Sequence, residues 1–133
     1  MPGGPAAAKP SALVSAPPVV SVKAGGKTYS VVGVFSTDAA RQHGLMSTRI
    51  TADQAGVFTW GGKSTTQTFW MLDTPQALSI LFVASGRVLG TAEMGTCKLS
   101  CPSYSSPGPY DTAVEALAGS FAHLTVGSPV SFG

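Results

Sequence analysis

The sequence predicts a mainly β protein: a compact β-sandwich or barrel-like single domain with one or two short helices. Three observations favour this fold class. The chain has 133 residues, which suits one domain that buries roughly two-thirds of its unfolded surface. Its 44% hydrophobic content can supply a core. Its apolar runs are short and are separated by glycine turns rather than by long helical patterns.

The first half of the chain begins with a segment of low complexity. Residues 1–18 are rich in Pro, Ala and Gly, so we expect a flexible or partner-ordered arm ahead of a β domain at residues 19–133. Two strands around Gly25-Gly26 predict a hairpin. A short helix follows, which Ser36-Thr37-Asp38 caps and Gly44 ends. The expected elements are strands at 19–22 and 28–35 and a helix at 39–43.

The second half predicts two more hairpins, one around Gly61-Gly62 and one around Ala84-Ser85-Gly86. Residues 95–110 form a loop rich in Gly, Pro, Ser and Cys, and loops of this length often carry function. A helical turn is expected near Phe121-Ala122-His123. The expected strands are 56–60, 65–71, 78–83, 87–94, 111–117 and 128–132.

The charge pattern argues against several classes of partner. The net charge of +2 comes from isolated Lys and Arg residues, whereas nucleic-acid binders cluster them, so we expect no nucleic acid partner. No apolar stretch approaches the roughly 20 residues of a membrane span, and the first residues show no secretory signal. Only 11% of residues are charged, which favours an exported, extracellular or particle-associated protein over a cytoplasmic one.

Several short motifs occur in a fixed order from about residue 28 onward. They are Arg41-Gln42-His43-Gly44-Leu45-Met46, Gly56-Val57-Phe58, Phe69-Trp70-Met71 with Asp73-Thr74, Leu78 with Ile80-Leu81-Phe82, Cys101-Pro102-Ser103-Tyr104, and Val114-Glu115 followed by Ala118-Gly119. Together they resemble the domain of unknown function family 192 (DUF 192) over most of the chain. The resemblance implies a small, mostly β domain, found alone or behind an export signal, with no settled biochemical activity.

The chain departs from the family pattern at two positions. Leu72 stands where the family usually has a basic residue, and Ser79 stands where it usually has an Asp. If that charge pair serves binding or catalysis in the family, this chain lacks both members. The two departures therefore argue against an enzyme.

The segment around Trp70 and Asp73 is the first candidate site. An aromatic pair leads into an Asp73-Thr74-Pro75 turn and then into an apolar strand. In one interpretation Trp70 stacks on a planar or sugar-like ligand while Asp73 accepts hydrogen bonds. In the other, which we favour, Trp70 fills the core and Asp73 makes an Asx-turn. Trp70, Asp73 and Thr74 are the candidate ligand or partner contacts at this corner.

The 95–110 loop is the second candidate site. Tyr104 and Tyr110 flank a stretch of Ser, Pro and Gly, and because Tyr is a common interface anchor we expect both to contact a partner. Cys97 and Cys101 are candidates for a disulfide that pins the loop. Free thiols are one alternative, and a metal or redox pair is another, although two thiolates supply only half a zinc site.

No catalytic signature joins the carboxylates, histidines and serines of this chain. Glu115 is either a buried acid with a raised pKa or, as we expect, an ordinary side chain that points outward from its strand. A soft site for Cu(I) could combine His43 with Met46, Met71 and Met94 and with the two cysteines, but methionine usually fills cores. We therefore expect no catalytic residue, no cofactor and no metal.

The sequence thus favours a binding or assembly module without catalysis. Its contact surface would combine the arm, the 95–110 loop and the corner at Trp70 and Asp73. One form is an accessory subunit of a larger particle, such as a viral head or tail, in which the arm orders on protein neighbours. The first alternative is an exported protein that binds a small ligand at the Trp70 and Asp73 corner. The second is a small enzyme that uses Glu115, Asp73 or a cysteine.

Overall fold

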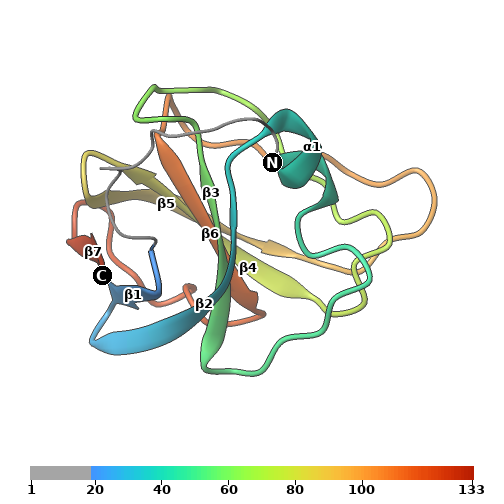
Figure 1. Ribbon diagram of the computed structural model, residues 1–133, viewed down its shortest axis with the longest axis horizontal. Coiled ribbons are helices and arrows are strands. Elements are labelled where there is room, and N and C mark those ends of the chain that lie inside the picture. The colour runs from blue at the N-terminus through green and yellow to red at the C-terminus, as the bar shows by residue number, and fades with distance from the viewer. Residues whose placement is uncertain (1–18) are drawn as a thin grey trace, which may run out of the picture.

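The structure is a computed structural model that describes residues 19–133, and the arm predicted at residues 1–18 lies outside the described residues. Within that range the chain forms one curled seven-stranded sheet and one short helix, so the predicted mainly β domain is confirmed (Figure 1). The elements are β1 (Ser21–Ala24), β2 (Lys27–Phe35), α1 (Asp38–His43), β3 (Gln54–Thr59), β4 (Leu78–Ala84), β5 (Arg87–Met94), β6 (Thr112–Leu117) and β7 (Val130–Phe132).

The strands follow the order β5-β4-β6-β3-β2-β1-β7 across the sheet. Neighbouring strands are antiparallel except β2 and β3, which run parallel and are connected through α1. The two edges of the sheet are joined by backbone hydrogen bonds. Val88 donates to Ser128 at 2.9 Å, Gly127 donates to Val88 at 2.8 Å, and Val130 donates to Gly86 at 2.9 Å. These bonds hold the sheet in a barrel-like curl.

Two of the three predicted hairpins are confirmed. Gly25-Gly26 joins β1 to β2, and Ser85-Gly86 joins β4 to β5. Both residues of each turn have positive φ, at 59° and 81° in the first and 50° and 73° in the second, as a two-residue turn that matches the strand twist requires.

The hairpin predicted around Gly61-Gly62 is wrong. β3 already has β2 on one edge and β6 on the other, so no edge is free for residues 65–71. That segment instead makes single bridges to the 95–110 loop, Thr65 with Tyr110 and Phe69 with Tyr104. The helical turn expected near Phe121 is a single hydrogen-bonded turn, in which Leu124 donates to Phe121.

Helix α1 forms as predicted. The hydroxyl of Thr37 accepts a hydrogen bond from the amide of Ala40 at 3.1 Å, which caps the first turn. The last turn ends at Gly44, whose amide donates to the carbonyl of Ala40 at 2.8 Å with a φ of 46°. Figure 1 shows α1 at the far end of the molecule from β1 and β7. No helix among residues 19–133 is long and apolar enough to cross a membrane.

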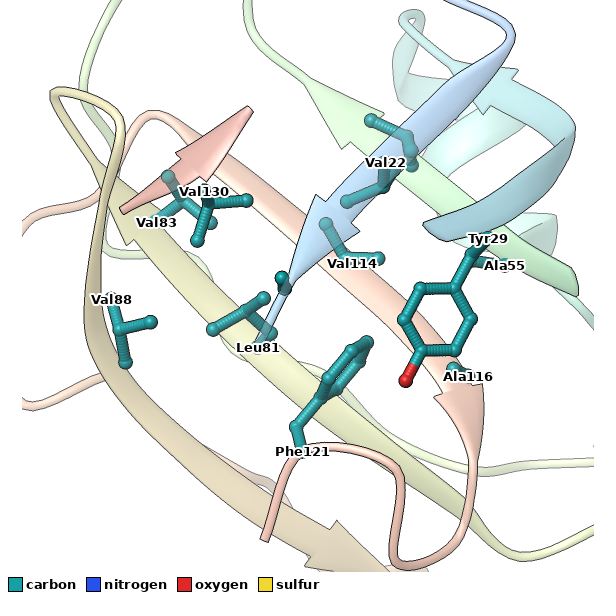
Figure 2. Packing of buried hydrophobic residues seen from close by; sticks show 12 residues of the cluster. Val22, Tyr29, Ala55, Leu81, Val83, Val88, Val114, Ala116, Phe121 and Val130 are labelled. Carbon is teal, nitrogen blue, oxygen red and sulfur yellow. The ribbon is translucent and has the colours of Figure 1, made fainter. Parts of the chain in front are cut away.

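Two apolar cores lie on opposite faces of the sheet. The inner core is enclosed by the curl, and Figure 2 shows its side chains meeting between β1 and the β4–β6 pair, with the rings of Tyr29 and Phe121 in edge contact at 5.5 Å. Its other members are Val22, Ala24, Ala55, Val57, Leu81, Val83, Val88, Val114, Ala116 and Val130. The outer core fills the space between the sheet and its covering loops. It consists of Leu45, Ile50, Phe58, Met71, Leu78, Ile80, Phe82, Met94, Tyr110 and Ala113.

Strand β6 contributes to both cores because its side chains alternate between the two faces. Val114 and Ala116 belong to the inner core, whereas Ala113 belongs to the outer core. Glu115 therefore lies on the outer-core face, beneath the covering loops.

Candidate functional site

A cavity of about 340 Å³ lies beside the outer core, and we call it the Glu115 pocket. Four parts of the chain form it: α1 with the turn that follows, the end of β3, the segment before β4, and β6. It is lined by Asp38, residues 41–46, Phe58, Trp60, residues 67–70, Thr74 and Glu115. Its size falls in the range typical of small-molecule sites.

Arg41 anchors α1 against the end of β3. Its guanidinium donates one hydrogen bond to the carbonyl of Thr59 and one to the carboxylate of Asp38, both at 2.7 Å, and it lies 5.1 Å from the ring centre of Trp60. Two donors of this pair, Arg41 Nε and Trp60 Nε1, are buried and have no hydrogen-bond partner within residues 19–133. The Arg41 guanidinium is thus held by hydrogen bonds within the protein, and the side chain forms one wall of the Glu115 pocket.

Aromatic rings set nearly at right angles form the other walls. The ring of Phe69 meets that of Phe58 at 5.0 Å and 83°, and that of Trp60 at 6.4 Å and 90°. Trp70 is 46% exposed and lies at the rim. The interpretation in which Trp70 fills the core is therefore wrong.

Glu115 is the buried polar group of this pocket. Its neighbours across the sheet are Gly56 on β3 and Ile80 on β4, and only 4% of the residue is exposed. Within the described chain no side chain or amide is hydrogen-bonded to its carboxyl. Burial raises the pKa of Glu115 to about 8, because the charged form is poorly solvated there. The expectation of an outward side chain is wrong, since loops cover that face of the sheet.

The 95–110 loop supports the wall opposite α1. Tyr110 is buried, and its hydroxyl donates to the carbonyl of Gln67 at 2.6 Å. Burial raises the pKa of Tyr110, although nearby Arg41 opposes the shift. Tyr104 is half-buried and exchanges backbone hydrogen bonds of 2.8 and 3.0 Å with Phe69. The prediction that Tyr110 contacts a partner is therefore wrong, because its side chain is buried and supports the pocket from inside the protein. Tyr104 is bonded to Phe69, in the segment that lines the pocket.

Asp73 lies apart from Trp70, in a second hollow of about 510 Å³ formed with Ser47, Pro75, Thr96 and Lys98. Its φ is 54°, a left-handed conformation that Asp tolerates. Its backbone amide donates to Cys97 and its carbonyl accepts from Ser47, but within residues 19–133 its carboxylate takes part in no hydrogen bond. The turn is closed by the amide of Thr74 bonding to Met71, so the expected Asx-turn is absent there. Thr74 lines both hollows.

Cys97 and Cys101 are joined by a disulfide in this structure. The carbonyl of Cys97 accepts from the amide of Asp73, so the closed ring is tied to the turn that precedes β4. In the described part of the chain, no three residues among His, Cys, Asp and Glu gather closely enough to hold a metal ion. Met71 and Met94 pack in the outer core.

Sequence reasoning singled out Trp70 and Thr74 but missed Glu115 and Arg41 as members of one site. A signal was present in the motifs that carry the family resemblance. Arg41-Gln42-His43-Gly44-Leu45-Met46, Phe58, Phe69-Trp70, Thr74 and Glu115 all line the Glu115 pocket. Motifs that are distant in sequence thus converge on one cavity.

Two solved structures share this fold. A protein of unknown function from Novosphingobium aromaticivorans has a TM-score of 0.73 and 25% sequence identity, and the match covers 97% of this chain and 99% of that chain. A "putative transcription regulator" from Sinorhizobium meliloti has a TM-score of 0.70 and 22% identity, with 84% and 90% covered, and this second likeness shows the fold alone. A search among curated proteins finds no match.

The family model of DUF192, described as "Uncharacterized ACR", matches residues 20–132. That range includes all seven strands, α1 and every residue that lines the Glu115 pocket. The resemblance indicated by the motifs is confirmed, and the chain belongs to the DUF192 family.

Proposed function

We propose that this domain binds a small organic molecule in the Glu115 pocket. The observation that carries the proposal is a buried carboxyl on the wall of an aromatic cavity of about 340 Å³. Ligand sites place polar groups beside apolar and aromatic walls. The Glu115 pocket has both kinds of lining, with four aromatic side chains beside polar ones such as Gln42, His43 and Gln67.

The cost of burying Glu115 supports a ligand-related role. An ionised carboxyl inside a protein is strongly destabilising unless a partner compensates it. Natural sequences depart from such local rules chiefly at functional sites. A Leu or Val at position 115 would suit the outer core better, because the neighbours on that face are Ile80, Phe58 and Leu45. A bound molecule that pairs with the Glu115 carboxyl would explain why this position holds an acid rather than an apolar residue.

The same geometry favours binding over catalysis. A side-chain nucleophile that is activated by a general base lies within hydrogen-bond reach of that base. His43 lines the same pocket, but its ring Nδ1 lies 3.2 Å from the carbonyl of Gly44. Within residues 19–133 no hydrogen bond joins Glu115 to another titratable side chain. The ligand site proposed at Trp70 therefore has Glu115, rather than Asp73, as its polar partner.

Tryptophan fluorescence provides the test, because both tryptophans of the chain line the Glu115 pocket. A library of small polar and aromatic compounds should contain ligands that quench the emission at saturable concentration. In Trp70→Ala and in Glu115→Gln, quenching of the remaining tryptophan emission should require higher ligand concentrations than in wild type. Asp73→Asn is the matched control, since it removes an exposed carboxylate outside this pocket while Asn tolerates the same backbone conformation. Equal binding by wild type and Trp70→Ala would remove the pocket as the site.

Protein contact is the second candidate function, and one observation favours it. Leu99 is 86% exposed and is held in the ring that the Cys97–Cys101 disulfide closes. A large apolar side chain on a constrained loop suits a partner's hollow better than water. This feature keeps the 95–110 loop as a candidate surface for the assembly role, although Tyr110 is not part of it.

Sedimentation of wild type and of Leu99→Ser, with candidate partners added, tests this second function. Association should weaken in Leu99→Ser and persist in the nearby control Lys98→Ser. Unchanged association in Leu99→Ser would exclude the loop tip as the contact.

A further inference from the structure

The Glu115 pocket contains an acidic group whose ionised form has no compensating cation among the pocket's own residues. The titratable groups that line it are Asp38, Arg41 and His43 on α1 and Glu115 on β6. Arg41 is paired with Asp38 at 2.7 Å, so its guanidinium is already engaged by another carboxylate. The strands beside β6 supply no charge, since neither β3 nor β4 carries an ionisable residue. Within residues 19–133 no cation lies at ion-pair distance from Glu115. Its ionised form would therefore be the uncompensated charge of the pocket.

The pocket is poorly equipped to bind an anion. The terminal nitrogens of Arg41 are used by Thr59 and Asp38. Its remaining nitrogen and the indole nitrogen of Trp60 are shielded from solvent, so a ligand cannot reach either without displacing α1. The pocket is also lined by aromatic rings, by the polar side chains Gln42, His43, Gln67, Thr68 and Thr74, and by Glu115, whose carboxyl is the acidic group without an ion-pair partner within residues 19–133. Aromatic faces carry negative potential, as does a carboxylate, so both features attract the same kind of ligand.

We propose that the Glu115 pocket binds an organic ammonium ion, with the carboxylate of Glu115 as its counter-ion and the rings of Trp60, Phe69 and Trp70 as its walls. This inference rests on the proposed function and names the ligand class of the same site. Phe69 meets Trp60 edge to face at 90°, and Trp70 lies at the rim, so more than one aromatic residue lines the pocket. Aromatic side chains of this kind recognise alkylated ammonium groups. The bound cation supplies the compensating charge that the protein lacks around Glu115.

Binding is coupled to a proton. Burial keeps Glu115 largely protonated at neutral pH, since its pKa is raised to about 8. An ammonium ion binds the ionised form, so binding releases the proton of Glu115 to the buffer. The apparent affinity should rise about tenfold per pH unit below pH 8 and level off above it. His43 faces the same pocket, so the variant His43→Gln is needed to separate its titration from that of Glu115.

The test uses choline as the probe, and neohexyl alcohol as its neutral analogue, in which carbon replaces the ammonium nitrogen. Isothermal titration calorimetry of the full chain should give at least tenfold tighter binding of choline than of the alcohol at pH 8. Choline binding should weaken at least tenfold in Glu115→Gln and about two- to fivefold in Trp70→Ala. Asp73→Asn should bind as wild type does. The pH dependence should persist in His43→Gln and vanish in Glu115→Gln.

The outcomes separate this inference from the proposed function. If the alcohol binds as tightly as choline and both lose affinity in Trp70→Ala, the pocket is a binding site but its ligands are not ammonium ions. If Glu115→Gln binds choline as wild type does, the counter-ion role is overturned. If neither these probes nor a compound library binds, the proposed function fails together with the inference.

Proton release provides a further test of the coupling. Calorimetry in buffers of different ionisation enthalpy should show release that approaches one proton per choline near pH 6. The absence of proton release would contradict the coupling to Glu115.

Discussion

At the scale of single residues, Glu115 shows how position overrides residue type. Acidic side chains are almost never fully buried unless they are paired. Here the alternation of β6 places Glu115 on the same face as Ala113, and loops then cover that face. The neighbouring side chains on the facing strands are apolar or absent, so the carboxyl gains no hydrogen-bond partner from those strands.

The residue-scale prediction concerns stability against pH. The pKa of Glu115 is about 8 in the folded state, against the ordinary value of 4.5 for a glutamate in the unfolded chain. Between these values the folded protein holds a proton that the unfolded chain has released, so the free energy of unfolding should fall as pH rises from about 4.5 to 8. The slope from this group approaches roughly 1.4 kcal/mol per pH unit.

Urea unfolding of wild type and Glu115→Gln, at pH steps between about 5 and 9, measures this slope. The variant should lose the Glu115 contribution and should exceed wild type in stability above pH 8, because Gln carries no charge to bury. Asp53→Asn is the control, since Asp53 is exposed in its pair with Lys27 and should leave the slope unchanged. Parallel curves for wild type and Glu115→Gln would contradict the raised pKa.

At the scale of elements, local signals were predictable from the sequence and long-range pairings were not. The Gly25-Gly26 turn and the cap at Thr37 act within a few residues, and each was identified correctly. The parallel pairing of β2 with β3 and the bridges from residues 65–69 to the 95–110 loop depend on chain segments that meet only after folding. The burial of Glu115 follows from those bridges, because they help fix the cover on the outer face. The site was therefore less predictable than the fold.

The element-scale prediction concerns helix α1, which positions Arg41 and His43 on the Glu115 pocket. Thr37→Ala removes the hydroxyl that accepts from the amide of Ala40, so the free energy of unfolding should fall by about 1 kcal/mol. Ser36→Ala is the matched control, since Ser36 is exposed and makes no side-chain hydrogen bond within residues 19–133. Urea unfolding provides the measurement, and amide hydrogen exchange should show faster opening of α1 in Thr37→Ala. Equal losses in both variants would mean that Thr37 does not cap the helix.

At the scale of the whole molecule, the two faces of the sheet carry different features: the inner face forms a closed apolar core, and the outer face carries the candidate binding site. The inner core is closed by the hydrogen bonds between the sheet edges and contains apolar side chains from every strand (Figure 2). The outer face carries the pocket, its exposed tryptophan and its buried acid. One strand, β6, links the two, with Val114 on the inner side and Glu115 on the outer. Substitutions at adjacent positions should consequently affect different properties.

Val114→Ala and Trp70→Ala test this separation. Val114 is buried in the inner core, so its truncation should lower the free energy of unfolding by roughly 2 kcal/mol. The affinity for choline should stay within twofold of wild type, because the side chain points away from the pocket. Trp70 is about half-exposed at the rim, so Trp70→Ala should lower the free energy of unfolding by less than Val114→Ala does, while it weakens choline binding. Urea unfolding and calorimetric titration of both variants, at a temperature where each is folded, give the two readouts. If Val114→Ala weakens binding as much as Trp70→Ala does, the two faces are coupled through β6, and the pocket depends on the packing behind it.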